Sequence, residues 1–238
     1  MSTDPHVFVV NAGSSSLKYQ VINAASGHTV AVGLVSEIGG ASRMRHDSIG
    51  PGGEVSRHES DAPCQTHTSA FAAARAALRE HGGGVGDHVV AIGHRVVHGG
   101  RRFTQPVVVD DVVLESLRVL SPLAPLHNPA NVEGIVRAQE AFPGLPHVAV
   151  FDTGFHGTLP PAAYTYAVPD SWRDEHHVRR YGFHGSSYAW VTRRTAALMG
   201  LTGKGKASRA TPTAKVEWER AASRRRSVFL LITLFTTA

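Results

Sequence analysis

The sequence has a single cysteine among its 238 residues, and it has no apolar segment of the kind that export or membrane insertion needs. Cys64 has no second cysteine to pair with, so an internal disulfide is excluded and nothing requires an oxidising compartment. The first apolar run, 7–10, follows no basic segment and predicts a buried strand rather than a signal peptide. The run 228–235 is too short to span a bilayer. We therefore expect a cytoplasmic protein that inserts in no membrane.

Positive charge is scarce in most of the chain and is confined to its end. The formal net charge is +5, but residues 201–238 contain eight Lys or Arg and only two Glu, a net charge of +6. The first 200 residues therefore carry a net charge of −1. A nucleic-acid or membrane-surface partner would rest on residues 201–238 alone, for which a solvated basic linker and one strand over 228–235 are the simpler interpretation. We expect no nucleic-acid partner.

Apolar periodicity predicts an α/β protein with a mixed sheet, because strands come first and helices then alternate with strands. Strands are predicted over 7–10, 17–22, 29–35, 89–92 and 147–151, with a tight hairpin between the first two. Four helices are predicted to begin at Thr68 or Ser69, at Asp110 or Asp111, at Asn128, and at Ser186 or Ser187. They end near residues 79, 120, 140 and 199. Residues 39–66 are rich in Gly, Ser, His and Arg, and we expect a loop with one weak strand at most.

The first candidate site is the turn of the predicted hairpin, Asn11-Ala-Gly-Ser-Ser-Ser-Leu-Lys18. A tight Gly/Ser turn presents backbone N–H groups and hydroxyls in one concavity, which suits a polyphosphate, and Lys18 adds a positive charge. The spacing is not that of a Walker A loop. An ordinary polar hairpin would explain the same residues.

Two further motifs combine basic side chains with strand or helix ends. Arg95 follows a predicted strand in Gly93-His-Arg-Val-Val-His-Gly-Gly, where its forked guanidinium suits a carboxylate or a phosphate. His94 and His98 have the spacing of a helical zinc pair, but no Cys or carboxylate completes the set, so structural hydrogen bonding is the preferred role for His98. His127 precedes a predicted helix N-terminus, where anions are favoured. A loop-filling histidine is an equally good interpretation.

The last two motifs add a carboxylate, an aromatic ring and a histidine. Asp152 follows the strand 147–151 at its carboxyl end, a usual catalytic position in α/β sheets, although an Asx-turn would need the same residue. Phe183 and His184 lie between glycines before the last predicted helix. They could form an apolar wall and a hydrogen-bond donor of a site, or simply a buried loop aromatic and a capping turn. Together the five motifs provide what phosphoryl transfer to an oxyanion requires.

The five motifs resemble, in order and spacing, the signatures of the acetate kinase family. The matching strings are Val9-Val-Asn-Ala-Gly-Ser-Ser-Ser-Leu-Lys-Tyr, Gly93-His-Arg-Val-Val-His-Gly-Gly, Pro125-Leu-His-Asn-Pro-Ala-Asn, Phe151-Asp-Thr-Gly-Phe-His and Arg180-Tyr-Gly-Phe-His-Gly-Ser-Ser. The resemblance implies an actin-like, ribonuclease H-like α/β fold of two similar domains. It also implies reversible transfer of a phosphoryl group from ATP to acetate, with Mg²⁺ as cofactor and a homodimer as the family's assembly. Propionate kinases share the strings, so propionate is an alternative substrate.

The resemblance further implies a role for nine residues. Catalytic roles fall to Asp152, His184 and His127, and acyl-substrate binding falls to Arg95 and Phe183. ATP-phosphate binding falls to Lys18, Ser14 and Ser16, and magnesium binding falls to Asn11. Acetate has no proton to lose at pH 7, so we expect Asp152 to orient Arg95, or to handle a proton in the reverse reaction, rather than to act as a base for acetate.

The resemblance stops near residue 200, where the charge also changes. The family continues into a strand and the loop His-Leu-Gly-Asn-Gly, then a second arginine, the adenosine pocket and a glutamate magnesium ligand, none of which is found in residues 201–238. We therefore expect residues 1–200 to form the N-terminal domain and the start of a truncated second domain. Residues 201–238 are then a non-matching, disordered or frameshifted tail. An inactive remnant without ATP binding is the alternative to a working kinase, and the family's dimer interface is expected to be missing.

Overall fold

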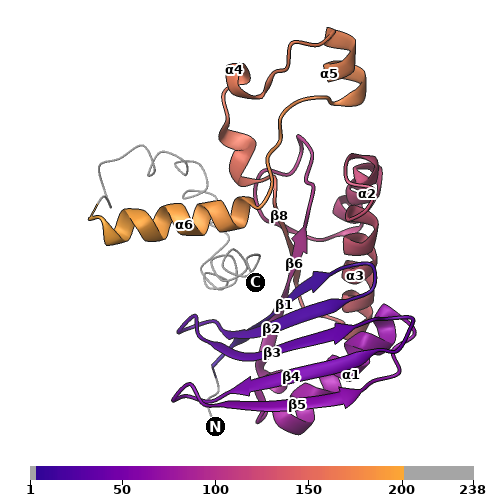
Figure 1. The fold of residues 1–238 in the computed structure, drawn as a ribbon, viewed down its shortest axis with the longest axis vertical. Coiled ribbons are helices and arrows are strands. Elements are labelled where there is room, and N and C mark those ends of the chain that lie inside the picture. The colour runs from indigo at the N-terminus through magenta and orange to yellow at the C-terminus, as the bar shows by residue number, and fades with distance from the viewer. Residues whose placement is uncertain (1–3, 201–238) are drawn as a thin grey trace.

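The computed structural model describes residues 4–200, whose strands form one eight-stranded mixed sheet (Figure 1). The strand order is β5-β4-β3-β2-β1-β6-β8-β7. Strands β1 to β5 pair in an antiparallel meander, β1, β6 and β8 are parallel, and β7 is antiparallel to β8. The strands are β1 (His6–Ala12), β2 (Leu17–Asn23), β3 (Thr29–Ser36), β4 (Arg43–Ile49), β5 (Val55–Asp61), β6 (Val89–Val96), β7 (Val107–Val108) and β8 (His147–Phe151).

The three helices before β8 lie on one face of the sheet, and another long helix ends the described part of the chain (Figure 1). The α-helices are α1 (His67–His81), α2 (Asp111–Val119), α3 (Asn128–Ala141), α4 (Pro161–Tyr164), α5 (Asp170–His176) and α6 (Gly185–Leu198). Short 3₁₀ turns lie at Val85–His88, Ser121–Leu123 and Phe155–Thr158. Within residues 4–200 no helix is long and apolar enough to cross a bilayer.

Strand β1 is buried on both faces, which explains its continuous apolar run. Phe8 and Val10 pack in a cluster with Phe71 of α1, whereas Val7 and Val9 belong to a separate buried cluster. A third cluster joins α2 and α3 to β6 and β8. The sheet therefore places the carboxyl ends of β1, β6 and β8 next to one another, where the predicted site residues lie.

The segment 39–66 differs from its prediction, because it contains two complete strands. In β4 only part of the chain, including Met44 and His46, is buried, and every residue of β5 is exposed. Polar bonds replace apolar burial in this part of the sheet. The buried Tyr19 hydroxyl pairs with Nδ1 of His46 at 2.7 Å, and Arg57 of β5 donates to Asp47 of β4 at 2.8 Å. The prediction of a loop was wrong because these strands lack an apolar alternation.

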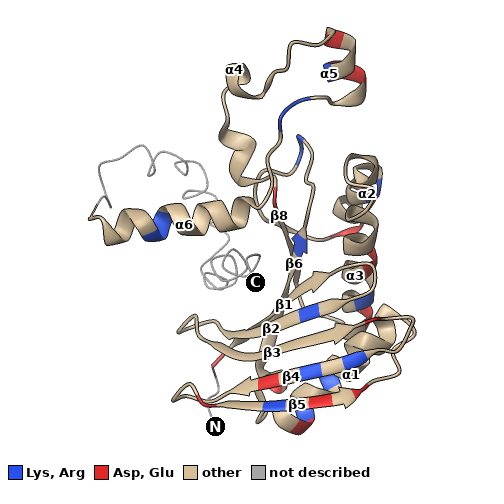
Figure 2. Ribbon diagram, in the orientation of Figure 1, with Lys and Arg blue, Asp and Glu red and all other residues tan. Residues whose placement is uncertain are grey.

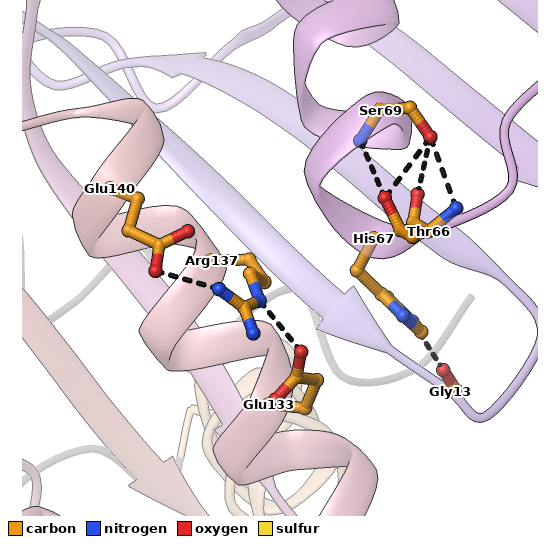
Figure 3. A network of polar contacts seen from close by, with 7 residues as sticks. All are labelled: Gly13, Thr66, His67, Ser69, Glu133, Arg137 and Glu140. Atoms are coloured by element: carbon orange, nitrogen blue, oxygen red, sulfur yellow. Dashed lines mark hydrogen bonds and ion pairs between the residues drawn. The ribbon is translucent and has the colours of Figure 1, made fainter.

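Helix starts agree with prediction only in part. Asp110 caps α2 as expected, and Gly82 ends α1. The N-cap of α1 is Thr66, not Thr68 or Ser69, and Ser69 completes a capping box with it. Figure 3 shows this box, and beside it the His67 ring reaching Gly13.

The other two predicted caps lie one to three residues too late. The N-cap of α3 is His127 rather than Asn128, and the N-cap of α6 is His184 rather than Ser186 or Ser187. Neither cap forms a side-chain hydrogen bond with its helix. The predictions for residues 201–238, including the strand over 228–235, lie outside the described residues.

Candidate active site

One cavity of about 1000 Å³ collects all nine residues that the sequence nominated. It opens at the carboxyl ends of β1, β6 and β8, between the β1–β2 turn, the start of α3 and the start of α6. Its lining includes Asn11, Ser14, Ser16, Lys18, Arg95, His127, Asp152, Phe183 and His184. Residues from opposite ends of the described chain therefore share one site.

The β1–β2 turn is a tight hairpin, as predicted. The Gly13 N–H donates to the Ser16 carbonyl at 2.9 Å, and Asn11 and Lys18 stand opposite each other in the register. His67 of α1 donates to the Gly13 carbonyl at 2.8 Å, and the Ile38 N–H donates to the Ser15 carbonyl at 2.9 Å. These three bonds engage three carbonyl oxygens of the turn, which reduces the number of acceptors available to repel an anion.

Arg95 and Asp152 form a bidentate ion pair at the centre of the cavity. Nε of Arg95 donates to Oδ1 at 3.1 Å and Nη2 donates to Oδ2 at 2.8 Å. The side chain of Asp152 is 1% exposed and that of Arg95 is 19% exposed. Strand pairing fixes both residues, because β6 and β8 are parallel neighbours and the Asp152 N–H donates to the Val96 carbonyl. The pair leaves Nη1 of Arg95 without a hydrogen bond to any residue of 4–200.

Two buried asparagines of α3 hold the strand ends in place. Asn131 accepts from the Val97 N–H at 3.0 Å and donates to the Ala12 carbonyl at 2.9 Å, which joins β6 to β1. Asn128 bonds both the N–H and the carbonyl of His98. Sequence reasoning gave Asn128 a capping role and passed over Asn131. The side-chain amide of Asn131 thus ties the end of β1, just before the β1–β2 turn, to the strand that carries Arg95.

His184 has a left-handed backbone, with φ of 53°. This conformation is uncommon for a non-glycine residue and occurs often at functional sites. The next residue must be glycine, because the Gly185 N–H donates to the Asp152 carbonyl at 2.8 Å and an added Cβ would lie 2.4 Å from that oxygen. The start of α6 is therefore fixed to the residue that orients Arg95, with Phe183 and His184 in the cavity lining.

His94 and His98, four residues apart, make separate contacts. His94 is buried and its Nε2 lies 2.9 Å from Nδ1 of His147, and burial together with His147 lowers the pKa of His94 well below its usual value. Nδ1 of His98 accepts from the Gly100 N–H at 2.9 Å, and burial lowers the pKa of His98. His98 therefore has the structural hydrogen bond expected of it. Among residues 4–200 no group of three or more His, Cys, Asp or Glu side chains is arranged to hold a metal ion.

The cavity also contains apolar residues that the sequence did not nominate. Val97, Leu123 and Leu126 line it together with Phe183. Val97 and Leu126 stand inside motifs already singled out, next to His98 and His127. The motifs located the right segments. Outside a regular helix or strand, however, the sequence does not show which of two neighbouring side chains faces the cavity.

Known proteins resemble this chain over most of its described length. The model of the acetokinase family matches residues 6–207. The acetate kinase of Leifsonia xyli is 52% identical over 196 residues, covering 82% of this chain and 48% of that relative. The acetate kinase of Streptomyces avermitilis is 50% identical over 200 residues, covering 83% and 49%. The chain thus spans about half the length of the curated relatives it matches.

Solved structures of a propionate kinase and an acetate kinase share the fold of this chain. The propionate kinase of Francisella tularensis superposes with a TM-score of 0.76 at 34% identity, covering 82% of this chain and 49% of that one. The acetate kinase of Porphyromonas gingivalis gives 0.74 at 37% identity over the same shares. The mixed sheet flanked by helices is therefore the actin-like fold that the sequence predicted. Because the family model covers more than half of its residues, this chain belongs to the acetokinase family.

Proposed function

We propose that this chain carries the carboxylate and phosphate side of an acetokinase site, at which a phosphoryl group passes between ATP and acetate. The observation that supports this most is the single cavity in which an oriented arginine, a lysine, two serines and two histidines converge. The names of its relatives, acetate kinase and propionate kinase, support this substrate class. We therefore propose for this chain the activity that those longer proteins are named for, with ATP and acetate as its partners and the cytoplasm as its location.

Arg95 is the residue we propose to bind the acyl substrate. Asp152 occupies Nε and Nη2, so the N–H groups of Nη1 are left for a carboxylate or phosphate oxygen. Asp152 then acts as a positioning residue. Both its oxygens accept from Arg95 and its side chain is almost fully buried, which suits orientation better than proton transfer. Val97, Leu126 and Phe183 provide apolar surface for the short alkyl group of acetate or propionate.

Lys18, Ser14 and Ser16 are proposed to bind the phosphates of ATP, and His127 and His184 the transferring phosphoryl group. Phosphoryl transfer needs two anions held in line and charge neutralised on the equatorial oxygens. The hydroxyls and the ammonium of the β1–β2 turn share one cavity with the Arg95 ion pair. That arrangement brings two oxyanions together and offsets their repulsion with fixed positive charge.

A magnesium ion fits this site only as a partner of phosphates. Asn11 is the one residue of the proposed set with a neutral amide oxygen, and both oxygens of Asp152 are already bonded to Arg95. Mg²⁺ commonly keeps several waters and relies on one or two protein oxygens plus substrate phosphates. Asn11 would supply such an oxygen, and the ion would add positive charge at the phosphates.

Binding of acetyl phosphate tests the proposed site. Calorimetric titration should give saturable binding that Arg95→Gln weakens by about 10- to 100-fold, the loss expected for a charge-assisted hydrogen-bond pair. Arg102→Gln is the matched control, because Arg102 bonds Ser116 of α2 instead of lining the cavity. Equal affinities for wild type and Arg95→Gln would contradict the proposal.

A second candidate is a chain that binds these ligands without turning them over. It is favoured by residues 201–238, where the family's His-Leu-Gly-Asn-Gly loop and second arginine are not found. Trapping of acyl phosphate by hydroxylamine, with acetate and propionate in parallel, measures transfer. This candidate predicts a rate at least about 10²- to 10³-fold below that of the Leifsonia xyli acetate kinase, as expected for one lost transition-state contact. Comparable rates would contradict it.

A further inference from the structure

Three arginines and three tyrosines gather outside the cavity, at the end of the molecule that carries α4 and α5. Arg101 lies in the loop after β6, and Arg179 and Arg180 lie between α5 and α6. Figure 2 shows basic positions on both of these connections near α5. Tyr164 ends α4, and Tyr166 and Tyr181 lie in the flanking segments. None of these six residues lines the cavity of the proposed site.

Tyrosine rings lie beside two of the guanidinium groups, and one of these groups is stacked on its ring. Cζ of Arg179 lies 3.5 Å from the ring centroid of Tyr164 and 5.3 Å from that of Tyr181. Cζ of Arg180 lies 5.9 Å from the ring centroid of Tyr166. A guanidinium that stacks on a ring keeps its N–H groups at its edge. Nε of Arg179 donates to the Arg180 carbonyl at 3.2 Å, which leaves the N–H groups of its two Nη atoms for an anion.

Backbone and side-chain bonds fix the segment that carries these arginines. The Arg180 N–H donates to the Tyr164 carbonyl at 2.9 Å. The Tyr181 hydroxyl donates to the His177 carbonyl at 3.0 Å, and the Val178 N–H donates to the Trp172 carbonyl at 3.1 Å. Because the loop is tied to both α4 and α5, a ligand would meet arginines that are already oriented, which lowers the entropic cost of binding.

The cluster has no carboxylate of its own. Every ion pair within residues 4–200 is formed by residues other than Arg101, Arg179 and Arg180. Asp174 is close enough for Arg101 to help lower its pKa, but Arg173 already binds both of its oxygens. Arg179 and Arg101 both act on Tyr181, where they oppose the rise in pKa that burial causes. Arg101 and Arg179 therefore lie close to the same tyrosine, and neither forms an ion pair with a carboxylate of residues 4–200.

The cluster adjoins the cavity through His98. The Tyr181 ring meets the His98 ring edge-on, with centroids 4.5 Å apart, and the Phe183 ring contacts the same histidine at 5.7 Å. Phe183 lines the cavity. Arg101 directly follows Gly100, whose N–H donates to His98. An anion held at the cluster would thus lie beside the proposed site.

We propose that Arg101, Arg179 and Arg180 form a second anion site, which binds the dianionic phosphate group of a small phosphorylated molecule. The three cationic groups form no ion pair within residues 4–200, and Arg179 is oriented by its stacking on Tyr164. They match the charge and the hydrogen bonding of such a group. Its role is to concentrate phosphorylated ligands next to the cavity by attraction. This role rests on the function proposed for the cavity, whereas anion binding by the three arginines does not depend on it.

Side-chain NMR of the arginine Nε–Hε groups tests this site with inorganic phosphate as the probe, at ionic strength held constant with potassium chloride. We expect saturable shifts of the Arg101, Arg179 and Arg180 signals and none at Arg102. Arg179→Gln should weaken phosphate affinity, as measured from the shifts at Arg101 and Arg180, by about tenfold, the loss expected for one charge-assisted hydrogen bond. Arg102→Gln should leave them unchanged.

Two further comparisons keep the result unambiguous. In Arg95→Gln the shifts at Arg101, Arg179 and Arg180 should persist, so failure of the cavity proposal and of this one are distinguishable. Arg180→Gln, at an exposed position, serves if Arg179→Gln does not fold. The proposal is overturned if these signals do not shift, if they shift without saturation as under general screening, or if Arg102→Gln weakens binding as much as Arg179→Gln.

Discussion

Replacing Asp152 by asparagine should destabilise the fold more than the loss of any surface ion pair. The amide would keep the shape of the side chain but lose its charge, which would leave the largely buried guanidinium of Arg95 without a counterion. Breaking a fully buried pair costs about 3–5 kcal/mol, and losing charge-assisted hydrogen bonds costs about 1.5–3 kcal/mol. Because Arg95 retains 19% exposure, we expect a loss of about 2–4 kcal/mol in the free energy of unfolding.

Urea denaturation followed by circular dichroism measures this loss. With a slope of about 2 kcal/mol per molar urea, the midpoint should fall by about 1–2 M. Asp174→Asn is the matched control, because Asp174 also binds an arginine at two oxygens but its side chain is 61% exposed. Its midpoint should stay close to that of the wild type. Equal midpoints for Asp152→Asn and Asp174→Asn would refute the reasoning that the Arg95 pair is a buried structural element.

Two other changes test the surroundings of the cavity and the core. Asn131→Ala removes the hydrogen-bond partners of the Val97 N–H and the Ala12 carbonyl. It should lower the free energy of unfolding by about 1–3 kcal/mol and speed hydrogen exchange of the Val97 amide. An unchanged exchange rate would count against the bridging role of Asn131. Burial lowers the pKa of His46 and His94, so the unfolded chain binds protons that the folded chain does not. The free energy of unfolding should therefore be at its full value above about pH 6.5 and fall below that pH by about 1.4 kcal/mol per pH unit for each histidine. The fall should be less steep in His94→Gln. Urea titrations at about pH 7, 6 and 5 measure it, and the same pH dependence in wild type and His94→Gln would contradict this expectation.

The sequence predicted the parts of the fold that burial or special backbone geometry marks strongly. The run 7–10 is apolar because β1 is covered on both faces, and the Gly/Ser run ends it in the predicted hairpin. Strand β8 and Asp152 at its end were also located correctly. Strands β4 and β5 were missed because their pairing depends on polar contacts, as between Arg57 and Asp47, which leave no apolar period.

The site residues, too, could be predicted where the local sequence marks them and were missed where only long-range contacts do. All nine nominated residues line one cavity because each lies at or next to the end of a strand or helix, and such ends converge in an α/β sheet. The bridging amide of Asn131 gave no signal, since its two partners lie 34 and 119 positions away. The Arg179 and Tyr164 stack escaped notice for the same reason, because only the folded segment between them brings the two together. Long-range polar contacts of this kind have no periodicity to detect.

The proposed function depends above all on Arg95, through which the cavity would bind a carboxylate or an acyl phosphate. A crystal structure of this chain soaked with acetyl phosphate tests it most directly. We expect the ligand between Lys18 and Arg95, with an oxygen within hydrogen-bond distance of Nη1 while Asp152 keeps its bonds to Nε and Nη2. A ligand bound elsewhere, or an Arg95 side chain that turns away from Asp152 and leaves the ligand untouched, would contradict the claim.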